Sequence, residues 1–218
     1  MNFCNKYLLN LLQNKNIKTM QSIEKQIEDK IKDDAKGTLL FPEDFQQLGS
    51  SEAVRLALHR IEKREIIRRV AHGIYVRPKE SSYIGEVMPT AEEVAEGIAK
   101  RDKIRIVPTG VYALHALGLS TQIPLKLVFL TDGAARTIKV GKRTIKLKRT
   151  TPKNLLAKGK ISSLVIQALR EIGIDKASPT ELKQILKLLK EEDLQLLKHD
   201  IKLAPEWIKQ IMKKAIDG

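Results

Sequence analysis

The chain has 218 residues, of which 42% are hydrophobic and 30% charged, a balance typical of folded domains rather than disordered chains. Its 40 Lys and Arg outnumber its 26 Asp and Glu, and the formal net charge of +14 predicts a polyanionic partner such as DNA, RNA or an anionic membrane. The single cysteine, Cys4, excludes an internal disulfide and a cysteine-cluster metal site, and no apolar run approaches the roughly 20 residues of a membrane span. We therefore expect a cytoplasmic protein without membrane span, metal or cofactor.

Residues 1–19 do not resemble a signal peptide, because Asn10, Gln13 and Asn14 interrupt their leucines. We interpret them as a tail or an upstream extension of the chain.

Residues 20–78 predict three helices followed by a β-hairpin. Ser22 can cap a helix with an apolar stripe at Ile23, Ile27 and Ile31. Pro42 suits the first turn of a short second helix. Ser50 or Ser51 can cap a third helix, which runs to about Arg64 and buries Val54, Leu58 and Ile61. Two β-prone runs, 66–70 and 74–77, then flank Gly73, which favours a hairpin turn.

Three helices and a hairpin in this order indicate a winged helix-turn-helix, whose third helix enters the major groove of DNA while the hairpin forms the wing. We expect DNA contacts from polar and basic side chains of both elements. On the third helix these are Ser50, Ser51, Arg55, His59, Arg60 and Lys63, and on the hairpin Arg68, Arg69, His72 and Arg77. Arg64 is expected to pair with Glu62 or Glu65 at the helix surface.

Residues 79–88 are polar, which predicts a linker to a second, basic α/β domain over 89–160. Thr90 and Glu93 form a capping box for a helix to about Arg101. A strand over 104–107, a helix from Val111 to Leu117, a strand over 125–130 and a hairpin of 137–140 with 144–147 follow. Residues 161–218 predict a C-terminal helical region, with a clear helix start at Ser178-Pro179-Thr180-Glu181.

Positive charge is concentrated in residues 103–160, which contain thirteen Lys and Arg and a single acidic residue, Asp132. Such one-sided charge repels itself and favours a face that binds a polyanion. We expect this second basic surface to comprise Arg136, Lys139, Lys142, Arg143, Lys146, Lys148 and Arg149. Phe129 is the only aromatic nearby, so stacking on single-stranded bases is not supported.

Catalytic patterns are absent from the sequence. The four histidines, His59, His72, His115 and His199, have no metal-ligand spacing, and no glycine-rich phosphate-binding loop occurs. An enzyme acting on nucleic acid would need clustered carboxylates in the basic domain, and Asp132 alone is too few for a two-metal site. We therefore expect a protein that is not an enzyme.

Three stretches carry a resemblance to a known family: AVRLALHRIEKREIIRRVAHGIYVRP (53–78), VPTGVYALHALGLSTQIP (107–124) and VFLTDGAARTIKVGKRTIKLKRT (128–150). Together they resemble the AbiEi-type antitoxins, transcriptional regulators of type IV toxin–antitoxin (abortive infection) systems. The resemblance covers roughly residues 20–150. It implies a winged-helix domain that represses its own operon and a C-terminal part that counteracts a nucleotidyltransferase-like toxin.

A different interpretation stays open, in which the chain is an RNA- or toxin-binding interaction module and its winged helix serves only as a scaffold.

Overall fold

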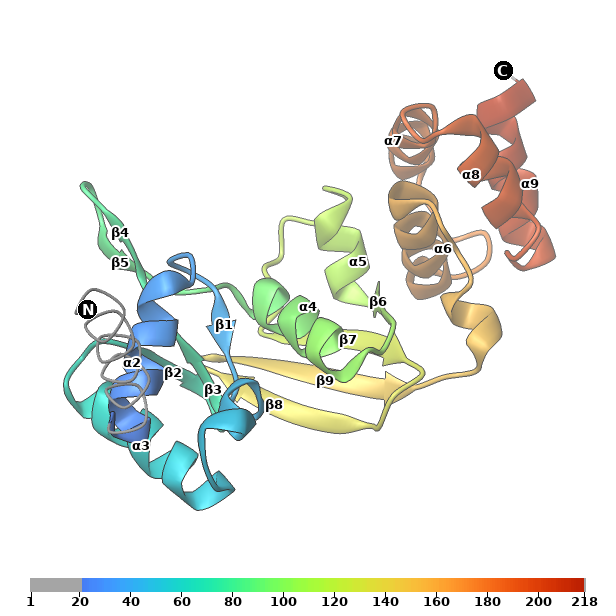
Figure 1. Ribbon diagram of the computed structural model, residues 1–218. Coiled ribbons are helices and arrows are strands. Elements are labelled where there is room, and N and C mark those ends of the chain that lie inside the picture. Colours follow the sequence, from blue (N-terminus) through green and yellow to red (C-terminus); the bar gives the residue numbers. More distant parts are fainter. Residues whose placement is uncertain (1–20, 218) are drawn as a thin grey trace, which may run out of the picture. The chain divides into compact units, whose positions relative to one another are not determined.

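The computed structural model describes residues 21–217 and has two compact units, divided between Pro89 and Thr90 (Figure 1). Each unit combines helices with β-strands, so the predicted α+β class is confirmed. The predicted tail at 1–19, with Cys4, lies outside the described residues.

The first unit contains three helical segments around one apolar core. They are α2 (Ile23–Asp33), the 3-10 helix η1 (Pro42–Leu48) and α3 (Ser51–Lys63). The hydroxyls of Ser22 and Ser50 accept hydrogen bonds from backbone amides of the first turns of α2 and α3, as predicted for helix caps. Ile27, Phe45 and Leu58 are fully buried in the core that these helices share.

A three-stranded antiparallel sheet completes this core. Its strands are β1 (Leu39–Leu40), β2 (Arg68–Ala71) and β3 (Ile74–Val76), in the order β1-β3-β2. The predicted hairpin between β2 and β3 is confirmed, and Gly73 has the positive φ of 67° that its turn requires. The sequence did not predict β1, because two residues are too few to show an alternating pattern.

The predicted linker at 79–88 is wrong as a description of this segment. Residues there form a second antiparallel hairpin, β4 (Lys79–Ser81) with β5 (Gly85–Val87). None of its strand residues is buried, so the hairpin lacks the apolar alternation by which a strand is recognised. Tyr83 and Ile84 are strongly exposed at its turn.

The second unit contains a four-stranded sheet that packs against helices (Figure 1). Its sheet order is β6-β7-β9-β8, with β7 parallel to β9 and the other pairs antiparallel. The elements are α4 (Ala91–Asp102), β6 (Ile106–Thr109), α5 (Val111–Ala116), β7 (Lys126–Thr131), β8 (Arg136–Val140) and β9 (Arg143–Arg149). The capping box of Thr90 and Glu93 forms as predicted.

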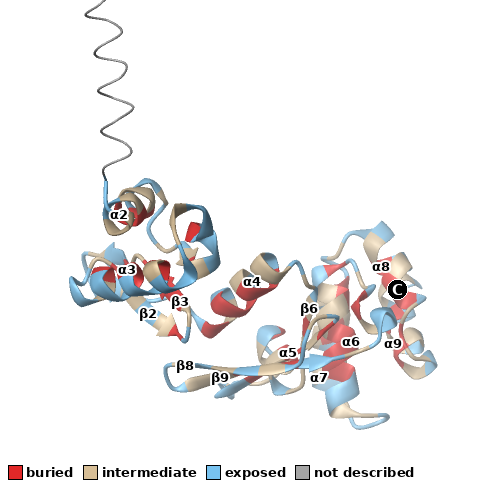
Figure 2. Ribbon diagram, turned by 60° about the horizontal axis from the view of Figure 1, so that its bottom comes forward, coloured by how far each residue is buried: buried red, intermediate tan, exposed pale blue. Residues whose placement is uncertain are grey.

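One face of the sheet is covered by α4 and α5 (Figure 2). The Tyr112 ring of α5 lies 5.5 Å from the Phe129 ring of β7, centroid to centroid. Leu127, Ile145 and Leu147 are also buried, and all three share this face with Phe129. In β9 the buried residues alternate with lysines, as the sequence predicted.

After the sheet come the 3-10 helix η2 (Pro152–Leu155), α6 (Lys160–Ile172), α7 (Pro179–Leu189), α8 (Leu194–Ile201) and α9 (Glu206–Asp217). Helices α6 to α9 share a core with α5. Ala113 and Leu117 pack into the same apolar cluster as Val165, Leu169 and Ile208. The predicted division at residue 160 therefore separates no compact units, because the apolar side of α5 is buried by the later helices.

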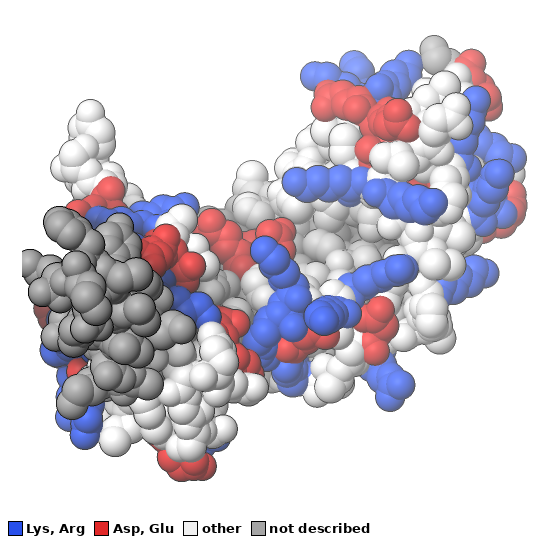
Figure 3. All heavy atoms as spheres, viewed as in Figure 1, with Lys and Arg blue, Asp and Glu red and all other residues white. Residues whose placement is uncertain are grey.

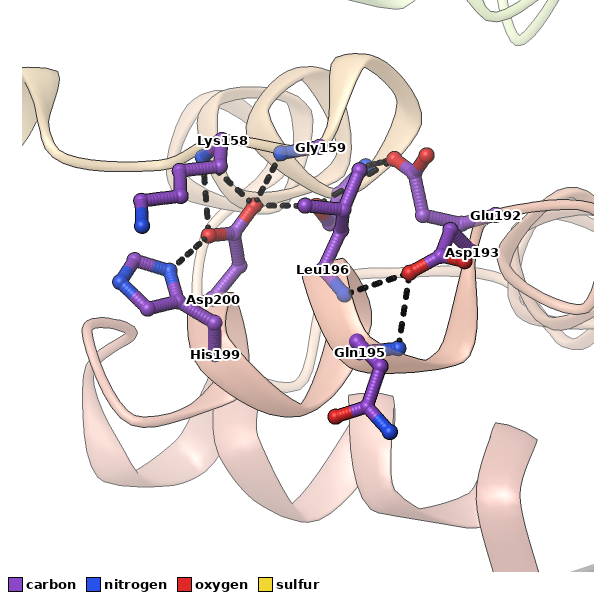
Figure 4. A network of polar contacts seen from close by, with 9 residues as sticks. Lys158, Gly159, Glu192, Asp193, Gln195, Leu196, His199 and Asp200 are labelled. Carbon is purple, nitrogen blue, oxygen red and sulfur yellow. Dashed lines mark hydrogen bonds and ion pairs between the residues drawn. The ribbon is translucent and has the colours of Figure 1, made fainter.

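The N-terminus of α6 is held by carboxylates from distant parts of the chain (Figure 4). Its cap position, Gly159, has no side chain that could accept hydrogen bonds, and a Cβ there would collide with Ser162 and Glu192. The buried Asp200 carboxylate instead accepts from the Gly159 amide at 2.8 Å and from the Ser162 hydroxyl at 2.5 Å. Glu192 accepts from the amides of Ile161 and Ser162. These bonds satisfy amides that a helix start leaves without partners.

Replacing Asp200 should destabilise the second unit. Burial alone raises the pKa of Asp200, but hydrogen bonds from Ser162, His199 and two backbone amides outweigh burial, so the net pKa is lowered. The stabilisation is then complete above the ordinary Asp pKa of about 3.9 and disappears as pH falls through the lowered pKa of the folded state. We expect Asp200→Asn to cost about 2–3 kcal/mol of unfolding free energy at neutral pH and to flatten its acid dependence.

Urea unfolding at several pH values measures both effects. Glu191→Gln, a carboxylate-to-amide change on an exposed residue of the same unit, serves as the control and should shift stability by less than about 0.5 kcal/mol. Equal stability of the two variants would contradict a capping role for Asp200.

Candidate nucleic-acid interface

Helix α3 presents a polar face opposite its buried stripe. Val54, Leu58 and Ile61 are buried at i, i+4 and i+7, as predicted, and anchor the helix to the first unit's core. The predicted contact residues on the outer side, Ser51, Arg55, His59, Arg60 and Lys63, are all exposed. Ser50 is also exposed, but its hydroxyl is occupied as the helix cap.

The exposed basic residues of α3 differ in their partners. Among the described residues, neither Arg55 nor Lys63 has a hydrogen bond or ion pair. His59 lies 3.7 Å from the Glu62 carboxylate, and Arg60 lies 3.5 Å from the Glu24 carboxylate of α2. Arg55 and Lys63 are therefore the α3 cations that could bind a phosphate or a base edge without first breaking an internal contact.

Arg64 joins α2 to α3, and its predicted pairing with Glu62 or Glu65 is wrong. Its Nη2 lies 2.9 Å from a Glu24 oxygen and 2.8 Å from a Glu28 oxygen. The buried Glu28 also accepts a hydrogen bond from Lys32 at 2.6 Å; this bond and those from Arg64 lower the pKa of Glu28 against the opposing effect of burial. The helix periodicity suggested a local partner, whereas the packing of α2 on α3 supplies closer ones.

Two of the predicted hairpin contacts are already engaged inside the first unit. Arg68 forms a bidentate pair with Glu86 of β5, with N–O distances of 2.9 and 2.8 Å. Arg77 donates to the Lys32 carbonyl at 2.8 Å. Because β5 was not predicted, the carboxylate partner of Arg68 was not predicted either.

The turn of the β2–β3 hairpin keeps two exposed basic groups together. Arg69 and His72 are exposed, and Arg69 Nη2 lies 3.0 Å from His72 Nδ1. No carboxylate pairs with either residue in the described part of the chain. This turn can therefore present a guanidinium and an imidazole to an anion.

A surface depression of about 520 Å³ lies between the end of α3 and β2. It is lined by His59, Glu62, Lys63, Glu65, Arg68 and Arg69. Two carboxylates among six lining side chains make it a poor pocket for a free anion, so we interpret it as part of a mixed-charge surface.

The second basic surface divides into paired and unpaired residues. Arg136 forms an ion pair with Asp102, and Arg143 lies 3.2 Å from Glu92, so both are joined to α4. The remaining predicted members, Lys139, Lys142, Lys146, Lys148 and Arg149, have no ion pair within residues 21–217. These acidic partners were not predicted, because Glu92 and Asp102 are distant in sequence from the strands that carry Arg143 and Arg136. Figure 3 shows basic side chains beside acidic ones on the side of the molecule it displays.

The part of the chain that the structure describes contains no candidate metal centre. Within it, no group of three or more His, Cys, Asp or Glu has an arrangement that could hold a metal ion. His115 contacts the Ser120 carbonyl at 3.3 Å, and His199 contacts Asp200 in the α6 cap. No helix in residues 21–217 has the length and apolar character needed to cross a membrane.

Replacing Arg64, the C-cap of α3, should destabilise the first unit more than replacing Arg55 within α3. Arg64→Ala leaves the buried Glu28 without one of its two cations, so we expect a loss of about 1–2 kcal/mol of unfolding free energy. Arg55→Ala, on the same helix but without a partner, should change stability by less than about 0.5 kcal/mol. Urea denaturation compares the two, and equal losses would disprove this division.

Comparison with known proteins gives one family and no function. No curated protein matches the chain. A family of unknown function, DUF6088, matches residues 26–197, which include most of α2, the other two helices and both hairpins of the first unit, and most of the second unit. The chain therefore belongs to the DUF6088 family.

Proposed function

We propose that this protein is a DNA-binding transcriptional regulator whose first unit is a winged helix-turn-helix. The observation that carries the proposal is that α3 exposes Arg55 and Lys63 without internal partners while the β2–β3 turn of the same unit exposes Arg69 and His72. A helix that fits the major groove and a basic turn beside it are the two parts such a reader needs.

The arrangement of elements supports this proposal. The first unit has the order helix, short strand, helix, helix and hairpin, and the short strand β1 pairs with the hairpin strand β3. A winged helix has the same order. The α3 residues named for DNA contact are not packed inside the protein, and 68–76 is a hairpin rather than a continuation of α3.

The internal contacts of the basic residues in the first unit determine which of them are candidates for DNA contact. Arg55 is the best candidate for a base edge, because an unpaired guanidinium can donate two hydrogen bonds to guanine. Lys63, Arg69 and His72 are candidates for the phosphate backbone. Arg68 and Arg77 instead stabilise the hairpin through Glu86 and the Lys32 carbonyl.

The biological role that we propose follows from the resemblance to AbiEi-type antitoxins. In this role the protein acts in the cytoplasm, represses its own operon, and counteracts a nucleotidyltransferase-like toxin encoded beside it. The family match neither names this role nor conflicts with it.

Arg55→Ala should reduce sequence discrimination. Losing a bidentate base contact costs about 1–3 kcal/mol, so the preference for the protein's own upstream DNA over a scrambled duplex should fall by roughly 10-fold or more. The matched control is Arg60→Ala, another exposed α3 arginine but one paired with Glu24, which should leave this preference unchanged. Gel-shift titrations of both duplexes measure it.

Equal weakening on both duplexes would show that Arg55 binds phosphate and would remove its base-reading role. If duplex RNA displaced the upstream DNA as well as unlabelled DNA does, the RNA-binding interpretation would replace the proposal.

Co-expression tests the antitoxin role separately. The wild-type chain should restore growth to cells that express a neighbouring nucleotidyltransferase-like toxin, and Arg55→Ala should restore it as well because antitoxicity is assigned to the second unit. Growth arrest in the presence of the wild-type chain would show that the protein has no antitoxin activity. The proposed role would then be repression alone.

A further inference from the structure

Strand register gathers four lysines on one face of the second unit's sheet. Residues paired directly across neighbouring strands share a face, and residues two apart on one strand do as well. Lys126 pairs with Thr144 of β9, and Thr144 also pairs with Lys139 of β8. Lys146 and Lys148 follow Thr144 at intervals of two residues, so all four lysines lie on the same face.

This face is open over β7, β8 and β9, whereas on β6 its Val107 is buried and its Thr109 donates a hydrogen bond to Gln167 of α6. Its other residues on β7, β8 and β9 are Val128, Leu130, Thr137 and Thr144, and none of the eight side chains that these three strands place on it is buried. The opposite face holds the buried Leu127, Ile145 and Leu147, on the strands that pack against α4 and α5. The lysines thus point to the side that these helices do not cover.

Acidic residues are missing from these three strands altogether. The two arginines that have carboxylate partners, Arg136 and Arg143, lie on the covered face with Ile138 and Ile145. The open face therefore keeps its full charge. Like charges at diagonal cross-strand positions, roughly 7–8 Å apart, repel one another, and a bound polyanion would relieve this repulsion.

We propose that this open lysine face, formed by Lys126, Lys139, Lys146 and Lys148, binds the phosphate backbone of duplex DNA. This inference rests on the proposed function, because duplex DNA is also the ligand proposed for α3, but the contacts of the open lysine face read no sequence. Ammonium groups suit phosphates as point charges. The face has no aromatic side chain on β7, β8 or β9, since Phe129 is on the covered side, so it lacks the stacking platform that single strands require.

The test replaces two lysines that lie next to each other on this face, in the full chain. Lys146→Gln with Lys148→Gln should weaken binding to a random-sequence duplex by about 10-fold at low salt and reduce the slope of log affinity against log salt by about 2. The control is Lys213→Gln with Lys214→Gln, two exposed lysines of α9, which removes the same charge elsewhere. Lys146→Arg with Lys148→Arg should retain both affinity and slope.

Several results would overturn the proposal. One is an unchanged salt slope in the Lys146 and Lys148 glutamine variant, and another is an equal loss in the α9 control, which would indicate net charge alone. A loss of binding to the toxin protein with DNA affinity intact would assign the face to an acidic protein partner. Failure of the proposed function is distinguishable, because it would appear in the wild-type chain as no preference for its own upstream DNA, whereas this test uses random sequence.

Discussion

The placement of carboxylates decides which basic side chains of this protein are free to bind a partner. An arginine that holds an internal carboxylate must give up that ion pair before it can hold a phosphate, and the loss is largest where the carboxylate is buried. In the first unit the pairs of Arg64 with Glu28 and of Arg68 with Glu86 connect elements that are separate in the chain. In the second unit Glu92 and Asp102 hold Arg143 and Arg136 in the same way.

The basic residues left without a carboxylate partner fall into two groups with different chemistry. On α3 and the adjacent turn, Arg55 and Arg69 offer planar guanidinium groups that can form directed, paired hydrogen bonds. On the open lysine face the cations are ammonium groups, which favour any phosphate regardless of the base beside it. A regulator that selects a site and also needs affinity has a use for both groups. Charge total alone could not distinguish them, because paired and unpaired cations contribute equally to the net charge of +14.

The sequence predicted what is encoded locally and missed what depends on distant residues. The stripe of α3, the glycine at the β2–β3 turn and the capping boxes at Thr90 and Ser178 were all predicted and confirmed, since each depends on residues within a few positions of one another. The β4–β5 hairpin was missed because its exposed strands lack an apolar side, and β1 because it is only two residues long. The site residues were chosen by charge, so Arg68, Arg77, Arg136 and Arg143 were included although their partners lie elsewhere in the chain.

Mapping of the DNA contact on the folded chain tests the central claim most directly. Amide chemical shifts, followed while the protein's own upstream duplex is added, report which residues change their surroundings. The account predicts the largest changes in the first unit at the outer side of α3, around Arg55 and Lys63, and at the turn that carries Arg69 and His72. If DNA bound with no change at α3 or that turn, the claim that the exposed basic residues of the first unit read the duplex would be contradicted.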